Sequence, residues 1–149
     1  MTIERTLLLS LRPRFADAIL AGTKTIEVRR RPVNASAGTP IILYASSPQR
    51  AVVGTARLAA VHSYDHNTAW RRHRHTLGLA RREFDDYLEG TSQVYLLHLG
   101  NVCRLNQPLP LQHLREDAPF QPPQSFRYVA ASDPSRLRDL VHPTAALTS

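Results

Sequence analysis

Apolar residues near the start of this chain change from one spacing to another, and each spacing predicts a different element. The run 7–11 is almost entirely leucine and predicts a buried strand. Residues 13–21 repeat their apolar positions at helical spacing, with a proline suited to the first turn and Gly22 suited to the stop. Residues 25–31 then alternate as a strand does. The pattern predicts a strand, a helix and a second strand in succession.

Later segments continue in the same way. Further strands are predicted over 41–45, 51–61, 92–105 and 125–129, and helices over 79–88, 111–115 and 134–141. Gly54 is expected to mark a bulge or a close backbone approach, and Asp133 is expected to cap the last helix. The tally favours one small α+β domain over residues 1–141, built on a mostly antiparallel β-barrel with flanking short helices, and a disordered tail over 142–149.

Composition narrows the class of protein. The chain has 149 residues, of which 42% are hydrophobic, and no apolar run approaches the ~20 residues that span a bilayer. Cys103 is the single cysteine, which excludes an intrachain disulfide. It is expected to be a buried, inert thiol in an apolar strand. These features predict a cytoplasmic protein without membrane contact, and nothing in the sequence calls for a cofactor.

The charge of the chain indicates its partner. The formal net charge is +7, and all but one of the 19 basic residues are arginines. A basic balance of this size favours nucleic acid, and above all single-stranded RNA, which cationic and aromatic side chains bind together. The alternative is a composition that is basic without such a role. A basic cluster with an aromatic residue at its edge is the candidate outer surface: Trp70, Arg71, Arg72, Arg74, Arg81 and Arg82.

The single lysine stands in the most informative segment, Gly22–Arg29. Lys24, Glu27 and Arg29 lie within it, and Glu27, Arg29 and Arg31 share one face of the predicted strand. Lysine is a titratable ammonium, unlike the permanently charged guanidinium of arginine. Lys24 and Glu27 are therefore candidates for ligand binding, for catalysis, or for a purely structural salt bridge.

Four further residues are candidates for the lining of a cleft: Tyr44, Ser46, Phe126 and Tyr128. The aromatic ones are equally suited to a core. Trp70 too is suited to a half-buried anchor. His73 and His75 stand two residues apart, which is poor helical spacing for metal ligands, so no metal site is expected.

The order of these segments resembles the ASCH domain, a family of PUA-like β-barrels. The segments 9–13 and 19–30 carry its motif G-x-K-x-x-E-x-R at Gly22, Lys24, Glu27 and Arg29. Further matching pieces are 42–48, 53–54, 83–90 and 122–128. The resemblance implies a barrel with a cleft facing the motif, and a domain that binds RNA or a modified nucleotide.

Some members of the family are enzymes, which implies an alternative function. They include small amidohydrolases that act on acetylated cytidine and a ribonuclease-like branch. The amidohydrolases pair a lysine at the Lys24 position with a threonine, where this chain has Glu27. They also use a glutamate where this chain reads Arg-His-Arg-His-Thr over 72–76. These departures argue against amidohydrolase activity. The expected function is binding of RNA or a modified nucleotide, and the alternative is an enzyme, ribonuclease-like or amidohydrolase-like, that acts on RNA or a modified nucleoside through Lys24 and Glu27.

Overall fold

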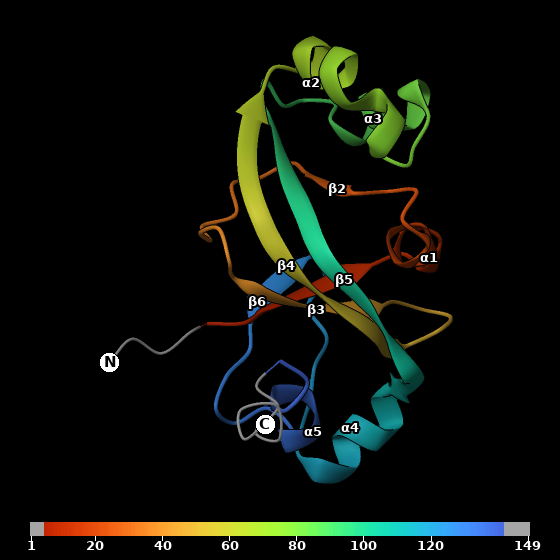
Figure 1. The fold of residues 1–149 in the computed structure, drawn as a ribbon, viewed down its shortest axis with the longest axis vertical. Coiled ribbons are helices and arrows are strands. Elements are labelled where there is room, and N and C mark those ends of the chain that lie inside the picture. Colours follow the sequence, from red (N-terminus) through yellow and green to blue (C-terminus); the bar gives the residue numbers. More distant parts are fainter. Residues whose placement is uncertain (1–4, 142–149) are drawn as a thin grey trace.

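The computed structural model describes residues 5–141, which form one six-stranded sheet with short helices around it (Figure 1). The strands are β1 (Leu7–Leu11), β2 (Ile26–Arg29), β3 (Pro40–Ala45), β4 (Ala51–Tyr64), β5 (Val94–Pro110) and β6 (Phe126–Tyr128). The helices are α1 (Pro13–Ala21), α2 (His66–His73), η1 (Arg74–Thr76), α3 (Arg81–Tyr87), α4 (Leu111–Asp117) and α5 (Ser135–Arg138). The predicted α+β class and the mostly antiparallel, barrel-like sheet are confirmed, and the sheet is an open half-barrel.

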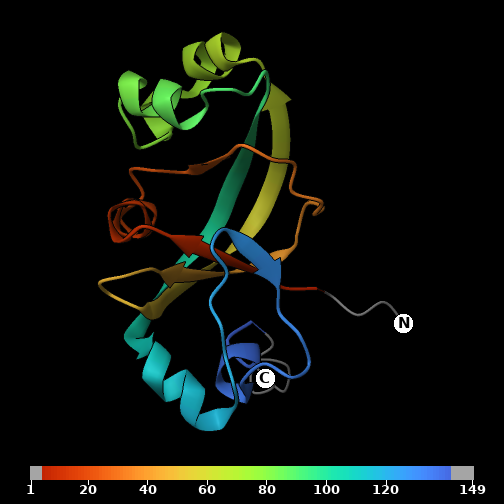
Figure 2. The ribbon, with the colours of Figure 1, turned by 180° about the vertical axis from the view of Figure 1, so that it is seen from behind.

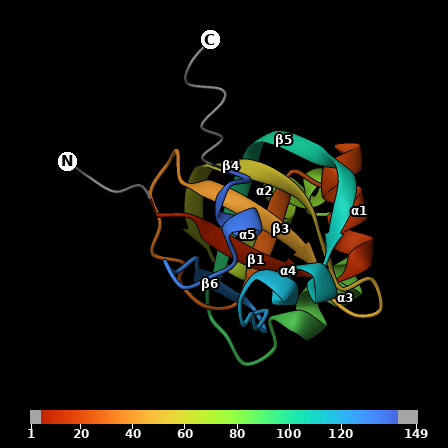
Figure 3. The same ribbon diagram turned by 90° about the horizontal axis from the view of Figure 1, so that it is seen from below.

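The sheet runs in the order β2-β5-β4-β3-β1-β6 and is mostly antiparallel. The exception is the parallel pair of β1 and β3, because α1 and β2 lie between them in the chain and return it to the same end. Seen along the long axis, the strands curl around one interior (Figure 3). The interior is filled by apolar residues of β1, α1, β3, β4 and β5, such as Leu9, Ile19 and Leu43.

Strands β4 and β5 form a long ribbon that carries helices at both ends (Figures 1 and 2). Both run well past the predicted ranges because register shifts let the pair bend without losing its pairing. One shift lies at Gly54, as predicted, where a Cβ would come within 2.6 Å of the Cys103 carbonyl oxygen. Helices α2 and α3 pack on one end of the ribbon, and α4 and α5 lie at the other.

Side chains join the two edge strands of the curled sheet. Arg29 at the end of β2 donates from Nη1 to Ser125 Oγ at 2.6 Å and from Nη2 to the Ser10 carbonyl at 3.1 Å. The Tyr128 hydroxyl on β6 donates to the carbonyl of Asn34, 2.6 Å away, in the loop after β2. The half-barrel is therefore closed by side-chain hydrogen bonds where backbone pairing ends.

Three local predictions are wrong. Asp133 does not cap the last helix: its carboxylate accepts hydrogen bonds from Arg127 and from the Ala130 amide, so α5 has no side-chain cap. That helix covers only Ser135–Arg138, and the predicted tail, 142–149, lies outside the described residues. Cys103 is exposed, because it lies where β4 and β5 bend and faces away from the interior.

No helix within residues 5–141 is long and apolar enough to span a membrane.

Candidate functional site

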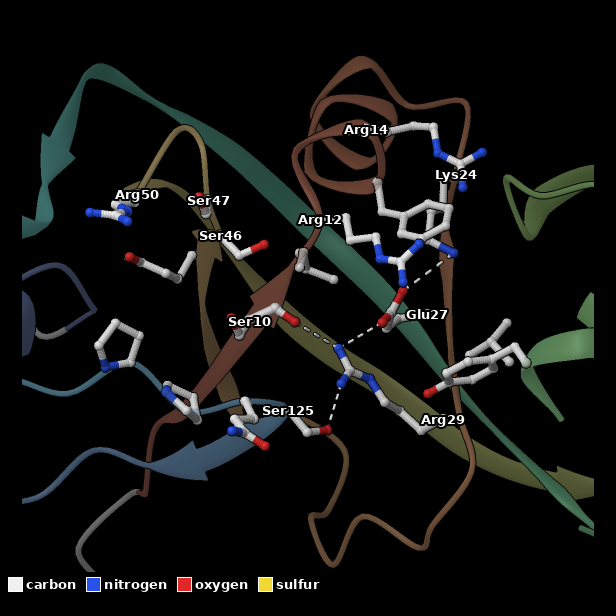
Figure 4. Close-up of a pocket in the computed structure, with 18 of the residues that line it drawn as sticks. Ser10, Arg12, Arg14, Lys24, Glu27, Arg29, Ser46, Ser47, Arg50 and Ser125 are labelled. Atoms are coloured by element: carbon white, nitrogen blue, oxygen red, sulfur yellow. Dashed lines mark hydrogen bonds and ion pairs between the residues drawn. The ribbon is translucent and has the colours of Figure 1, made fainter. Parts of the chain in front are cut away.

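One large cavity, called here the central cavity, opens between α1, α3, the end of β3 and the segment before β6. Its volume is about 1080 Å³. The cavity is lined by Ser10, Leu11, Arg12, Arg14, Phe15, Lys24, Glu27, Val28, Arg29, Tyr44, Ser46, Ser47, Arg50, Leu79, Glu83, Asp86, Tyr87, Leu111, Arg115, Gln121, Pro122, Pro123, Gln124 and Ser125. The Gly22–Arg29 segment thus forms one wall of it (Figure 4).

Lys24 is the largest fully buried side chain of the described residues, with 1% of its surface exposed. Its Nζ donates to the Leu77 carbonyl at 2.5 Å, lies 3.3 Å from Glu27 Oε1, and lies 5.1 Å from the Phe15 ring centre. Its stem packs on Gly78, where an added Cβ would come within 2.9 Å of it. Burial lowers the pKa of Lys24, and the Glu27 carboxylate opposes that shift.

Glu27 joins the lysine to the cavity floor. Its Oε2 lies 2.7 Å from Arg29 Nη2, and both side chains are more than nine-tenths buried. Because Arg29 also holds Ser125 and Ser10, an unbroken polar chain runs from the loop before α3, through Lys24 and Glu27, to the segment before β6. Figure 4 shows the part of this chain from Lys24 to Ser125. Each buried charge has a partner of opposite sign, which offsets the cost of its burial.

Other parts of the cavity wall are cationic and more exposed. Arg12 and Arg50 are exposed, and neither guanidinium pairs with another described residue. Arg115, another lining residue, donates to the Phe120 carbonyl. Figure 4 shows Arg50 beside the hydroxyls of Ser46 and Ser47 and across the cavity from Glu27 and Arg29. Free guanidinium groups beside hydroxyls suit a phosphate-bearing ligand.

Other titratable groups of the cavity differ in their ion pairs and in the direction of their pKa shifts. Arg14 pairs with Glu83, and this partner, with a backbone amide of Ala80, lowers the pKa of Glu83 to about 2. Burial raises the pKa of Tyr44, so its phenol stays protonated at neutral pH. The carboxylate of Asp86 is exposed and pairs with no described residue.

The structure brings five of the sequence-predicted residues into this cavity: Lys24, Glu27, Arg29, Tyr44 and Ser46. Arg31 does not reach it, because β2 ends at Arg29 and Arg31 is exposed beyond the strand. Phe126 and Tyr128 do not line it either. Both pack on the barrel interior, where strand alternation turns their rings away from the cavity.

The predicted basic cluster lies on α2, η1 and α3, outside the cavity lining: Arg71, Arg72, Arg74, Arg81 and Arg82. All five are exposed. Arg81 pairs with Asp85 and donates to Asn67 Oδ1. Trp70 is half-buried, with its ring 5.3 Å from that of Phe84, as expected of an anchor. The cluster is therefore a separate surface from the central cavity.

Several cavity residues were not singled out from the sequence, notably Arg12, Arg50, Tyr87 and Ser125. They come from four separate segments, so no spacing along the chain joins them. Arg12, Tyr87 and Ser125 do stand inside the pieces 9–13, 83–90 and 122–128 that carry the family resemblance. That resemblance was the signal that could have found them.

Residues 5–141 contain no group of three or more histidine, cysteine, aspartate or glutamate side chains arranged to hold a metal ion. The nearest approach is a histidine cluster on the ribbon, away from the cavity. His62 Nδ1 lies 3.1 Å from His98 Nε2, and the His73 ring centre lies 5.3 Å from that of His98. This cluster joins α2 to the strands rather than forming a site at the cavity.

Comparisons with known proteins agree with this architecture. The ASCH domain family matches residues 9–103. A curated protein of Zymomonas mobilis subsp. mobilis, an "ASCH domain-containing ribonuclease", is 37% identical over 135 residues, covering 89% of each chain. The crystal structure of ASCH from Zymomonas mobilis superposes with a TM-score of 0.82 at 32% identity, covering 99% of this chain and 98% of that one.

More distant structures share only the fold. The N-terminal domain of Staphylothermus marinus McrB matches with a TM-score of 0.57 at 12% identity, covering 93% of each chain. The family match extends over more than half of the sequence and includes the whole Lys24–Glu27–Arg29 segment. On this evidence the chain belongs to the ASCH domain family.

Proposed function

We propose that this chain binds single-stranded RNA in the central cavity and cleaves it there. The observation that carries the proposal is a cavity whose lining combines unpaired arginines with a buried Lys24–Glu27–Arg29 chain. Its support from comparison is a relative named as a ribonuclease, aligned over 89% of both chains. A half-barrel of this size with a net charge of +7 suits a polyanion.

Arg12 and Arg50 are the groups proposed to hold the backbone. A guanidinium group can donate two parallel hydrogen bonds to one phosphate. Both are free to do so, because neither guanidinium forms an ion pair with a described carboxylate. The hydroxyls of Ser46 and Ser47 lie beside Arg50 and can donate to the same phosphate (Figure 4).

The proposed reaction is attack by a ribose 2′-oxygen on the adjacent phosphorus. A new P–O bond forms to the 2′-oxygen, and the bond from phosphorus to the 5′-oxygen of the next nucleotide breaks. Glu27, held in place by Lys24 and Arg29, is the proposed acceptor of the 2′-hydroxyl proton. Tyr44 remains protonated because burial raises its pKa, and it is the proposed donor to the leaving 5′-oxygen. The arginines would stabilise the charge on the phosphate.

The exposed cluster on α2, η1 and α3 is proposed to hold RNA that extends beyond the cavity. Arg71, Arg72, Arg74 and Arg82 form no ion pair with a described residue, so they are available to phosphates. Arg81 is less suited, because Asp85 already neutralises it. These contacts would add affinity without sequence preference.

Binding and cleavage are tested separately. Binding is measured with 2′-O-methyl RNA, which lacks the attacking hydroxyl, over a range of salt concentrations. Arg12→Ala and Arg50→Ala should each reduce the slope of log affinity against log salt by about 0.7 for every phosphate that the variant no longer neutralises. Arg104→Ala, an exposed arginine outside the cavity, is the matched control and should leave the slope unchanged.

Cleavage is measured with unmodified RNA and the variants Glu27→Gln and Tyr44→Phe. Each should lower the cleavage rate by about 100-fold or more while 2′-O-methyl RNA still binds. Wild-type protein that binds RNA but leaves it intact would restrict the function to binding. Wild-type protein that binds no RNA at low salt would refute the whole proposal. A parallel incubation with acetylcytidine tests the amidohydrolase alternative.

A further inference from the structure

The two ends of the central cavity differ in chemistry. The end near Arg50 is cationic, because Arg50 and Arg115 both act on Tyr44 there and the hydroxyls of Ser46 and Ser47 lie beside Arg50. The other end, beneath α3, is bordered by the apolar side chains of Leu79, Phe15 and Val28 and by the ring of Tyr87. RNA has the same division, since its backbone is charged and its bases have apolar faces.

Tyr87 is unusual for its position. It is the large hydrophobic side chain that stays exposed among the described residues, at 41%. Partial burial raises the pKa of Tyr87, so its phenol stays protonated at neutral pH. The ring is thus part of the cavity wall and is accessible to a ligand. An accessible aromatic ring is what an unstacked base requires.

One residue before Tyr87, Asp86 supplies an acceptor on the same cavity wall. It is exposed and pairs with no described residue, whereas the neighbouring Asp85 pairs with Arg81 and lies outside the lining. A carboxylate accepts hydrogen bonds and cannot donate them. It therefore favours a base with an exocyclic amino group, such as cytosine, and disfavours the carbonyl that uracil presents there.

We infer that the α3 end of the central cavity binds one unpaired nucleobase that carries an amino group, stacked on Tyr87 with Asp86 accepting from that group. The inference rests on the proposed function, because it names the part of the RNA that this end of the cavity holds. Arg12 and Arg50 hold phosphates whatever the sequence, and Tyr87 and Asp86 supply the preference among bases.

The test compares two 2′-O-methyl heptanucleotides, one all uridine and one with a central cytidine, by fluorescence anisotropy. Wild-type protein should bind the cytidine oligonucleotide about 10-fold more tightly, as expected for a hydrogen bond to a charged group. Asp86→Asn should reduce that preference below threefold, and Asp85→Asn, the matched control, should keep it. Tyr87→Ala should weaken binding of both oligonucleotides by about 5- to 100-fold. Tyr87→Phe should stay within threefold of wild type, and Tyr95→Ala, outside the cavity, within twofold.

The outcomes separate the two proposals. Tight binding of both oligonucleotides by wild type and by Tyr87→Ala would overturn the stacking role and leave RNA binding intact. Equal binding of the two oligonucleotides by wild type would overturn the role of Asp86. Absence of binding to either oligonucleotide at low salt would refute the proposed function, and the base site with it. Circular dichroism of each variant confirms that weaker binding does not reflect unfolding.

Discussion

Replacing Lys24 tests whether the buried polar chain holds the cavity together. Lys24→Met keeps the length of the side chain and removes its charge, so the Leu77 carbonyl loses its donor and Glu27 loses one of two cations. Breaking a buried ion pair costs about 3–5 kcal/mol when the remaining charge is uncompensated. Because Arg29 stays 2.7 Å from Glu27, we expect the low end, about 3 kcal/mol.

Double-mutant analysis isolates the interaction from other effects of each substitution. Glu27→Gln should cost about 2 kcal/mol, because its amide still accepts one hydrogen bond but leaves two buried cations without their carboxylate. If Lys24 and Glu27 act together, the double variant should be less destabilised than the sum, with a coupling of about 1–2 kcal/mol. Arg31→Met, an exposed cation just beyond β2, is the matched control and should cost less than about 0.5 kcal/mol.

Urea unfolding followed by fluorescence of Trp70 measures these changes. Trp70 is the single tryptophan and packs against Phe84, in the helical layer that Lys24 ties to the barrel through Leu77. A loss below about 1 kcal/mol in Lys24→Met would refute the anchoring role. Additive effects of Lys24→Met and Glu27→Gln would show that the 3.3 Å contact contributes nothing to folding.

The same geometry predicts that arginine cannot replace this lysine. The stem of Lys24 passes against Gly78, whose φ of +76° already favours glycine, and its tip lies between the Leu77 carbonyl and Glu27. A guanidinium group is larger than the ammonium that fits there, so Lys24→Arg should cost about 1–3 kcal/mol through overpacking. Its stability must be measured first, because absence of RNA cleavage in that variant could otherwise be mistaken for loss of a titrating amine.

Three further measurements test other parts of the structure. Burial first, and the facing imidazole of His62 second, lower the pKa of His73 and His98, so the unfolded chain binds protons more readily than the folded one. The melting temperature should therefore keep its full value at pH above the ordinary histidine pKa of about 6.5 and fall as the pH drops below it. In His98→Gln this fall should be smaller, because one of the two histidines is gone. Gly78→Ala should cost at least about 1 kcal/mol in urea unfolding, because its Cβ would meet Lys24. Cys103 should react with a thiol reagent in the folded protein at nearly its unfolded rate, because it is exposed, and slow labelling would contradict its position.

The sequence predicts the elements of this fold well because its core strands have strong local patterns. The leucine run of β1, the helical spacing of α1 and the stop at Gly22 depend only on near neighbours. Strand lengths were underestimated, because β4 and β5 continue through exposed and half-buried residues wherever they pair with each other. The exposure of Cys103 was missed for the same reason: bending of a ribbon is a tertiary property.

The residues of the candidate site likewise divide into those that are near one another in sequence and those that meet only in the folded chain. Lys24, Glu27 and Arg29 were found because all three stand in one eight-residue segment, which leads into β2 and includes it. Arg50 and Tyr87 lie far from them in sequence and meet them only across the cavity. The cluster of arginines over residues 71–82 was a weaker predictor of the cavity, because cations on exposed helices need not contact one ligand together.

Arg29 shows why the site and the fold cannot be separated in this chain. It ends one edge strand, and its guanidinium reaches Ser125 beside the other, so it replaces the backbone pairing that a closed barrel would have. The same group fixes the carboxylate of Glu27 from below while Lys24 fixes it from above. A closed ladder would pair the backbone groups of both edge strands directly and leave no gap between them at this place. By leaving the sheet open and closing it through Arg29, the chain obtains a cavity whose floor is already charged and held in position.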